Sequence, residues 1–187
     1  MAPPLGYAYY RRAGCDRYRS RLRWRRAREL QHGRLLNGRY NQSVPYPEPL
    51  IAAMRQDLTR YGVEEARTPQ DVDRLLGPDS GAVLMIVNSV CGCAAGRARP
   101  AIGLALQHAV RPSKVASVFA GSDEAAVAHL RARLSDYPPS SPSMALFQDG
   151  RPVYMLHRSE IERREPAEIA GILTEVFDQF CVARQPV

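Results

Sequence analysis

The middle of the chain reads Ala82-Val83-Leu84-Met85-Ile86-Val87-Asn88-Ser89-Val90-Cys91-Gly92-Cys93-Ala94-Ala95-Gly96. Its first six residues are a continuous apolar run with β-branched side chains, the pattern of a strand covered on both faces. The composition from Ala94 to Gln107 favours a helix. The sequence therefore predicts two thiols, one residue apart, where a buried strand meets a helix, and dithiol redox chemistry needs that arrangement.

The thiol pair has a physical reason to lie at the start of a helix. Only the thiolate of cysteine is nucleophilic, and it is scarce at neutral pH because the free thiol titrates at about 8.5. Unpaired N–H groups at a helix start lower that pKa. Arg97 and Arg99 follow within about two turns of helix and would lower it further if their side chains fold back toward the sulfurs.

Charge is distributed unevenly along the 187 residues. The chain carries a net +7, yet residues 1–42 alone hold eleven Arg against Asp16 and Glu29, a net of +9, which leaves −2 for residues 43–187. We expect residues 1–42 to be a disordered Arg/Tyr-rich extension, or sequence upstream of the true start, with a possible short helix over 20–36. An arm that binds RNA or an acidic surface is the alternative, and it would confine nucleic-acid binding to the tail.

Cysteine usage and hydropathy indicate the compartment. No apolar stretch approaches the roughly 20 residues that span a bilayer, and the N-terminus lacks the apolar core of a secretory signal, so we expect a cytoplasmic protein without a membrane partner. Four cysteines scattered over this length do not form a disulfide framework. In a reducing compartment a close pair is catalytic or binds a metal. We expect Cys15 and Cys181 to be free thiols without a role.

Turn and cap signals divide residues 43–187, the predicted dithiol domain, into further elements. Thr68 before Pro69 marks a helix start, and Asp149-Gly150 between two apolar runs is a hairpin signal. Pro100 should kink the helix that contains it, and 157–160 should form a surface loop. The predicted elements are helices 49–61 and 69–76, strand 82–87, helix 94–107, strand 115–120, helix 123–134 capped by Ser122 or Asp123, strands 144–147 and 153–156, and helix 166–180.

The predicted order places a parallel β-α-β unit before an antiparallel hairpin and a helix. The crossover that joins strands 82–87 and 115–120 is expected to be right-handed, as such crossovers normally are. With a dithiol at the first β-to-α junction, this is the layout of the thioredoxin fold. We expect an α/β protein, a single thioredoxin-like domain whose mixed sheet is flanked by helices. In that fold a cis-proline precedes the strand facing the thiols, and Pro142 is the candidate, although sequence cannot distinguish it from an ordinary loop proline.

The chain closely resembles the bacilliredoxin family, thioredoxin-like proteins with a Cys-Gly-Cys site. The resemblance covers about residues 45–181, and the segment before Pro45 departs from the family pattern. The matching stretches are Tyr46-Pro47-Glu48-Pro49-Leu50, Arg67-Thr68-Pro69, Val87 to Gly96, Ala98-Arg99-Pro100, Val118-Phe119-Ala120-Gly121, Pro138 to Ser143, and the hairpin.

The resemblance implies removal of bacillithiol, a low-molecular-weight thiol, from mixed disulfides on oxidised proteins. Cys91 would attack and take over the bacillithiol group, and Cys93 would resolve it through a redox-active Cys91–Cys93 disulfide, or leave this to a second bacillithiol. It also implies bacillithiolated client proteins and a reductase as partners, no bound cofactor, and weak disulfide isomerase activity. Cys91 is the expected attacker on physical grounds too, since it should lie exposed at the junction while Cys93 enters the first turn.

Four further residues are candidates for binding the substrate. Backbone groups beside Ser141 and Pro142 could hold an incoming thiol in extended form. Arg97 and Arg99 could pair with the carboxylates of an anionic thiol, and solvated helix arginines are the alternative. The one-residue spacer closes a very small disulfide ring, which predicts a potential above the thioredoxin value of about −270 mV.

Three other functions stay open. The chain could exchange disulfides on proteins or act on a different small thiol. It could bind a metal through the Cys-Gly-Cys pair, but a second pair of ligands at the usual spacing is missing from the sequence. It could also be a redox-sensing module whose basic tail contacts RNA or a partner protein.

Overall fold

Strand β2 (Ala82–Asn88) lies at the centre of a five-stranded sheet in the computed structural model, which describes residues 45–181. The strand order is β1-β3-β2-β4-β5. The other strands are β1 (Glu64–Glu65), β3 (Lys114–Phe119), β4 (Ser143–Gln148) and β5 (Arg151–Leu156), and the α-helices are α2 (Glu48–Thr59), α3 (Pro69–Leu75), α4 (Arg99–Ala105), α5 (Glu124–Arg133), α6 (Arg158–Ile161) and α7 (Pro166–Phe180). The predicted extension over 1–42 and its possible helix lie outside the described residues, so that division of the chain stays a prediction.

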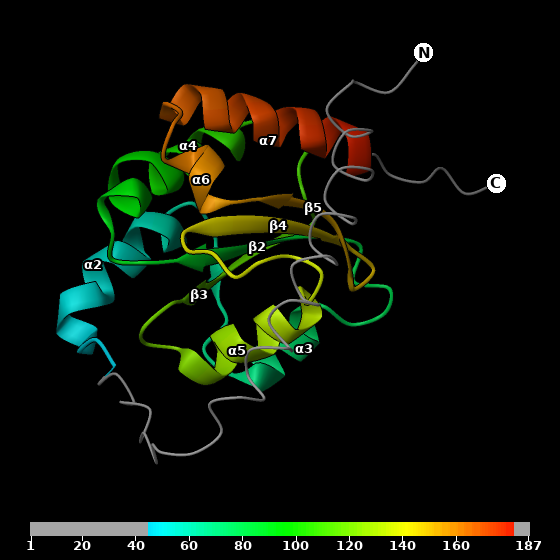
Figure 1. The fold of residues 1–187 in the computed structure, drawn as a ribbon. Coiled ribbons are helices and arrows are strands. Elements are labelled where there is room, and N and C mark those ends of the chain that lie inside the picture. The colour runs from blue at the N-terminus through cyan, green and yellow to red at the C-terminus, as the bar shows by residue number, and fades with distance from the viewer. Residues whose placement is uncertain (1–44, 182–187) are drawn as a thin grey trace, which may run out of the picture. The chain divides into compact units, whose positions relative to one another are not determined.

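The sheet is covered on both faces, as the continuous apolar run of β2 predicts. Leu84 and Ile86 pack into one core cluster with residues of α4 and α7, while Val83, Met85 and Val87 pack into the other with residues of α3 and α5. Figure 1 shows these helix pairs on opposite sides of the strands. Successive β2 residues therefore enter opposite cores, and all seven are buried.

The pairing of β2 defines the fold. β2 runs parallel to β3 on one side and antiparallel to β4 on the other, and β4 pairs antiparallel with β5. The helical segment after the two cysteines connects β2 to β3 across one face. This is the thioredoxin-like arrangement predicted from the sequence, and that prediction is confirmed.

The β4–β5 hairpin has the turn that the sequence predicts. Asp149 (φ 49°) and Gly150 (φ 76°) both have positive φ, which is the requirement of a two-residue type I′ turn. The register of the pair shifts between Leu146 and Phe147, opposite the stretch that contains Pro152. Pro152 has no N–H to donate to the ladder, and its place in the edge strand β5 accommodates this.

The helix predicted over 94–107 is interrupted. It contains a π-helical segment, Ala94–Ala98, and continues as α4. The N–H of Arg99 donates to the carbonyl of Ala94, five residues back, and Pro100 then has no N–H with which to continue an ordinary ladder. The disturbance expected at Pro100 thus takes the form of a widened turn directly before it.

Helix starts match the sequence with one exception in detail. Thr68 caps α3, and its hydroxyl and the Asp71 carboxylate form a reciprocal capping box. Asp123 occupies the N-cap position of α5 as predicted, but its side chain makes no capping bond. Its carboxylate is occupied by Arg55 and by the N–H of Phe119 instead.

Two short elements differ from the prediction. β1 has two residues, both glutamates, and pairs with β3 only through its backbone. The predicted surface loop over 157–160 is wrong, because Arg158–Ile161 forms α6 and buries Ile161 in the core. Glu160 bonds the N–H of His157 and caps this turn.

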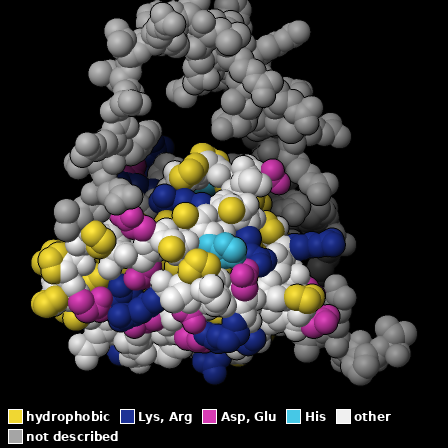
Figure 2. Space-filling view, turned by 90° about the horizontal axis from the view of Figure 1, so that it is seen from below, with side chains coloured by type: hydrophobic (Ala, Val, Ile, Leu, Met, Phe, Trp, Pro, Cys, Tyr) yellow, Lys and Arg dark blue, Asp and Glu magenta, His cyan; other side chains and the backbone are white. Residues whose placement is uncertain are grey.

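The face formed by α3 and α5 presents charges of both signs. In the part that Figure 2 shows, basic and acidic side chains lie interspersed with apolar ones. Ion pairs join several charged side chains of these helices and their neighbours: Asp73 bonds both His129 and Arg133, and Arg74 bonds Glu64. Among the described helices, none combines the length and the apolar character needed to cross a bilayer.

Candidate active site

The two cysteines follow the carboxyl end of β2. Asn88, the last residue of β2, lies opposite Phe119 of β3, and Val87 lies opposite Ser143 of β4. Cys91 and Cys93 therefore lie at the edge of the sheet where β3 ends and β4 begins. Both are free and partly exposed.

The sulfur of Cys91 is held by polar neighbours. Its Sγ lies 3.3 Å from Ser89 Oγ and accepts from the N–H of Ala94 at 3.4 Å. Burial by itself raises the pKa of Cys91, but hydrogen bonds from the Cys93 and Ser89 side chains and from the N–H groups of Ala94 and Cys93 outweigh it, so the pKa falls below its ordinary value. The helix start thus supplies backbone donors to this thiolate, as expected.

The pKa values of Cys93 and Cys181 are shifted upward, opposite to that of Cys91. Burial, the hydrogen bond with Cys91 and the negative charge on Cys91 raise the pKa of Cys93, against a lowering by Arg158. Burial and Asp178 raise the pKa of Cys181 to about 11. Cys91 and Cys93 are both partly exposed, so exposure does not by itself distinguish them. Their electrostatic surroundings separate them instead.

The loop before β4 lies beside the dithiol. The Ser141–Pro142 peptide bond is cis, as predicted. Ser143 donates its hydroxyl to the carbonyl of Ser140 at 2.9 Å, while Val87, four residues before Cys91, pairs with Ser143. Ser141 is partly exposed and Pro142 is buried. The structure thus brings Ser141 and Pro142 to the same edge as the sulfurs, and their role in binding substrate stays a prediction.

Arg99 points into the protein. Its side chain is 4% exposed; Nε donates to Asp57 at 3.1 Å, and Nη1 donates to Asn88 Oδ1 at 3.2 Å and to the Ser89 carbonyl at 3.1 Å. These partners bind the guanidinium that was expected to pair with a carboxylate of the substrate. Through these contacts Arg99 supports the Asn88–Ser89 turn.

Arg97 points away from the turn toward α7. Its Nη1 donates to the carbonyl of Arg164 and to Glu165 Oε1, each at 2.7 Å. The expectation that Arg97 and Arg99 fold back to lower the thiol pKa is not met by these contacts. A role for Arg97 in binding a carboxylate stays a prediction.

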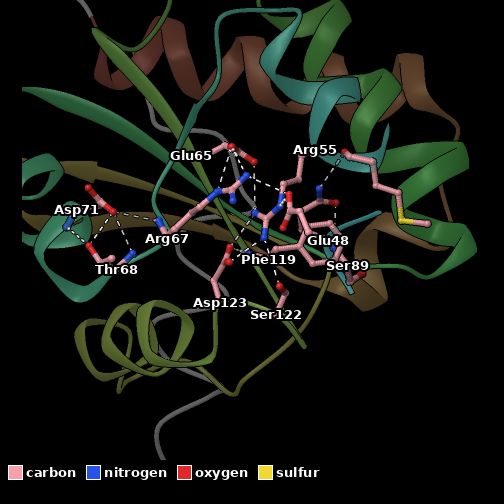
Figure 3. A network of polar contacts seen from close by, with 12 residues as sticks. Glu48, Arg55, Glu65, Arg67, Thr68, Asp71, Ser89, Phe119, Ser122 and Asp123 are labelled. Carbon is pink, nitrogen blue, oxygen red and sulfur yellow. Dashed lines mark hydrogen bonds and ion pairs between the residues drawn. The ribbon is translucent and has the colours of Figure 1, made fainter. Parts of the chain in front are cut away.

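Arg55 of α2 belongs to a buried ion cluster that the sequence analysis missed. Arg55 forms a bidentate pair with Asp123 at 2.8 and 2.9 Å, both side chains are 6% exposed, and its guanidinium carbon lies 5.1 Å from the centre of the Phe119 ring. Glu48 and Glu65 surround it further. Figure 3 shows these side chains converging between α2 and the end of β3.

Helix α2 connects this cluster to the dithiol turn. Besides Arg55, it carries Met54, whose carbonyl accepts from Asn88 Nδ2 at 3.3 Å, and Asp57, which accepts from Arg99. Asn88 Oδ1 in turn accepts from the N–H of Ser89 at 2.9 Å. α2 thus supports the turn that presents Ser89 to Cys91.

Arg158 is the second residue that the sequence analysis missed. It opens α6 directly after β5, and its backbone N–H donates to Ser140 Oγ at 3.3 Å. The hydrogen bond to Glu162 and then the negative charges of Cys93 and Cys91 raise the pKa of Arg158. Its positive charge is therefore within electrostatic range of the dithiol.

Metal ligands do not gather at the site. Within residues 45–181 no group of three or more His, Cys, Asp or Glu side chains is arranged to hold a metal ion.

A thioredoxin-like sheet with a dithiol at its first β-to-α junction and one acidified thiol defines a thiol-disulfide oxidoreductase. The comparisons agree with this class. The model of a family described as disulphide isomerase matches residues 46–181, and curated bacilliredoxins match at 40–47% identity. The chain belongs to the bacilliredoxin family.

Three relatives illustrate the extent of the match. A bacilliredoxin of Salinibacter ruber is 46% identical over 145 residues, 76% of this chain and 84% of its own. One from Koribacter versatilis is 46% identical over 138 residues, 74% of this chain and 95% of its own. One from Geobacillus kaustophilus is 42% identical over 137 residues, 73% and 94% of the two chains.

Proposed function

We propose that the chain removes bacillithiol from mixed disulfides on cytoplasmic proteins, with Cys91 as the attacking thiol and Cys93 as the resolving thiol. The observation that carries this proposal is the asymmetry of the pair. The pKa of Cys91 is lowered and that of Cys93 is raised, so Cys91 is the more readily ionised of the two thiols. The name that the curated relatives share supports the choice of small thiol.

The first step is an exchange of one disulfide for another. The Cys91 thiolate attacks the bacillithiol sulfur of the mixed disulfide, a bond forms between these two sulfurs, and the client protein leaves as a thiolate that takes up a proton. Hydrogen bonds from Ser89 and Ala94 stabilise the attacking thiolate before the step.

The second step releases the small thiol. Cys93 loses its proton and attacks the Cys91 sulfur, which forms the Cys91–Cys93 disulfide and expels bacillithiol as a thiolate. Alternatively, a second bacillithiol attacks the bound one and leaves as the oxidised dimer, with Cys91 restored. In the first route, two electrons from a reductase or a small thiol regenerate the dithiol.

The test is mass spectrometry of the Cys93→Ala variant after incubation with a bacillithiolated protein. We expect one bacillithiol trapped on Cys91, and none on Cys91→Ala, which is the matched control. Label on Cys93 in Cys91→Ala, or label on neither variant, would contradict the assigned roles.

Protein disulfide isomerisation is the second candidate, because the matching family model is described as disulphide isomerase. In this activity Cys91 would attack a protein disulfide, and the client's own released thiolate would resolve the adduct. Recovery of ribonuclease activity from its scrambled form measures it. Isomerisation without any release of bacillithiol from mixed disulfides would favour this second function.

A further inference from the structure

Arg158 lies beside the dithiol edge because of strand register. Ser143 of β4 pairs with Val87 of β2, and the next β4 residue, Met144, pairs with Leu156 of β5. Arg158 comes two residues after Leu156, and Cys91 comes four residues after Val87. Both residues therefore lie beyond the same end of the sheet. The 140–142 loop lies between them, and its Ser140 accepts from the Arg158 N–H.

The guanidinium of Arg158 has donors to spare. Its side chain is 50% exposed and uses Nε to bond Glu162 at 3.2 Å. Among residues 45–181 no hydrogen bond engages its two terminal nitrogens. Two N–H groups in a planar fork are what a carboxylate binds best.

Arg97 and Arg99 direct their guanidinium groups to partners within the protein. Arg99 is buried against three acceptors, and Arg97 is bonded at the start of α7. Arg158 thus combines nearness to the sulfurs, exposure and free donors.

We propose that Arg158 determines specificity by binding a carboxylate of the small thiol while the sulfur of that thiol lies at Cys91. The substrate class is a mixed disulfide whose small-thiol half carries a carboxylate. This inference rests on the proposed function, and it moves the anion-binding role from Arg97 and Arg99 to a residue 67 positions after Cys91 in the sequence.

The first test compares two leaving groups on one client protein. We expect Arg158→Gln to raise KM about tenfold for the bacillithiol mixed disulfide, the loss of about 1.4 kcal/mol of binding, and to leave KM for the uncharged 2-mercaptoethanol mixed disulfide unchanged. Arg158→Lys should recover part of the loss, since its ammonium keeps the charge without the fork. Equal effects on both substrates, or none on the first, would overturn the proposal.

Arg163→Gln is the matched control. Arg163 is exposed, comes two residues after α6, and has no polar partner among the described residues. It should leave both KM values unchanged. A loss for the anionic substrate as large as that of Arg158→Gln would mean that overall surface charge decides, and the proposal would be wrong.

A second measurement does not depend on turnover. Iodoacetate is an anion and iodoacetamide is neutral, so the ratio of their rates at Cys91, read by peptide mapping, cancels the thiolate fraction and reports the local field. Arg158→Gln should lower this ratio several-fold, and Arg163→Gln should not change it. An unchanged ratio overturns the role of Arg158. A lowered ratio with no turnover of the bacillithiolated client overturns only the proposed function.

Discussion

Arg99 and Ser89 are joined by a hydrogen bond from Nη1 to the Ser89 carbonyl at 3.1 Å, and the hydroxyl of the same serine lies 3.3 Å from the Cys91 sulfur. A buried cation is therefore connected to the reacting atom through one residue. The guanidinium of Arg99 is bound by Asp57, Asn88 and Ser89 in this arrangement. Arg99 is a positioning residue, because it fixes the turn from which Ser89 reaches the sulfur.

Arg99→Ala should destabilise the protein and lower the reactivity of the Cys91 thiol. Loss of three charge-assisted hydrogen bonds, partly offset by entry of water, should lower the free energy of unfolding by about 2–3 kcal/mol. Because the turn then loosens, the alkylation rate of Cys91 at neutral pH should fall several-fold. Urea unfolding and iodoacetamide kinetics measure the two effects, and Arg60→Ala, which also contacts Asp57 but not the turn, is the control. A loss of stability with unchanged alkylation kinetics would show that Arg99 stabilises the fold but does not position the turn beside Cys91.

Ser89→Ala isolates the contribution of the hydroxyl. Without this hydrogen bond the pKa of Cys91 should rise, since the contact lowers it in the intact protein. The curve of alkylation rate against pH should shift to higher pH, with an unchanged plateau where the thiol is fully ionised. Ser113→Ala removes a hydroxyl at the opposite end of β2, where it bonds the Ala82 carbonyl, and should leave the curve in place. Identical curves for the two variants would contradict the role of Ser89.

The three described cysteines should react in a fixed order. The pKa of Cys91 is lowered, that of Cys93 is raised, and that of Cys181 is raised to about 11. As pH increases, the thiolate of Cys91 appears first, so its modification should accelerate at the lowest pH. Peptide mapping after brief exposure of the reduced protein to iodoacetamide at neutral pH should show label on Cys91 before the other two. Faster labelling of Cys93 would exchange the proposed roles of attacker and resolver.

The sheet and its helices could be predicted because their signals are local. The apolar run of β2, the Thr68 cap and the Asp149-Gly150 turn each act within a few residues. The two glutamates of β1 carry no such signal, since they form a strand only through backbone bonds to β3.

The site was only partly predictable because its contacts are long-range. The helical spacing of Leu50, Ile51, Met54 and Leu58 predicts one apolar face of α2. Ile51 and Leu58 are buried, but Leu50 is 54% exposed, and the charged Arg55 is buried as well. Its partner Asp123 lies 68 residues away, and no sequence spacing indicates such a pair. Likewise, a position on a helix does not fix where Arg97 and Arg99 point, and the nearness of Arg158 to the sulfurs follows from the register of β4 and β5.

Arg55→Met should cost about 3–5 kcal/mol of stability, because it leaves the buried Asp123 carboxylate without its cation. Arg60→Met, at the exposed end of the same helix, should cost about 0.5 kcal/mol or less. Chemical denaturation measures both. If Asp123→Leu is added to Arg55→Met, most of the loss should be recovered, since apolar replacement of a whole buried pair is often close to neutral. An equally unstable double variant would show that the pair is needed for packing as well as charge.

Removal of residues 1–42 should leave thiol exchange intact. The family match begins at residue 46, and the matched region of this chain corresponds to 95% of the Koribacter versatilis bacilliredoxin, so relatives without a comparable extension contain the same domain. All contacts made by Cys91, Ser89 and Arg99 described above lie within residues 45–181. The truncated chain and the full chain should release bacillithiol from a mixed disulfide at the same rate. Loss of that activity together with the tail, while the truncated chain keeps its circular-dichroism spectrum and thermal midpoint, would instead support the redox-sensing module that acts through its basic arm.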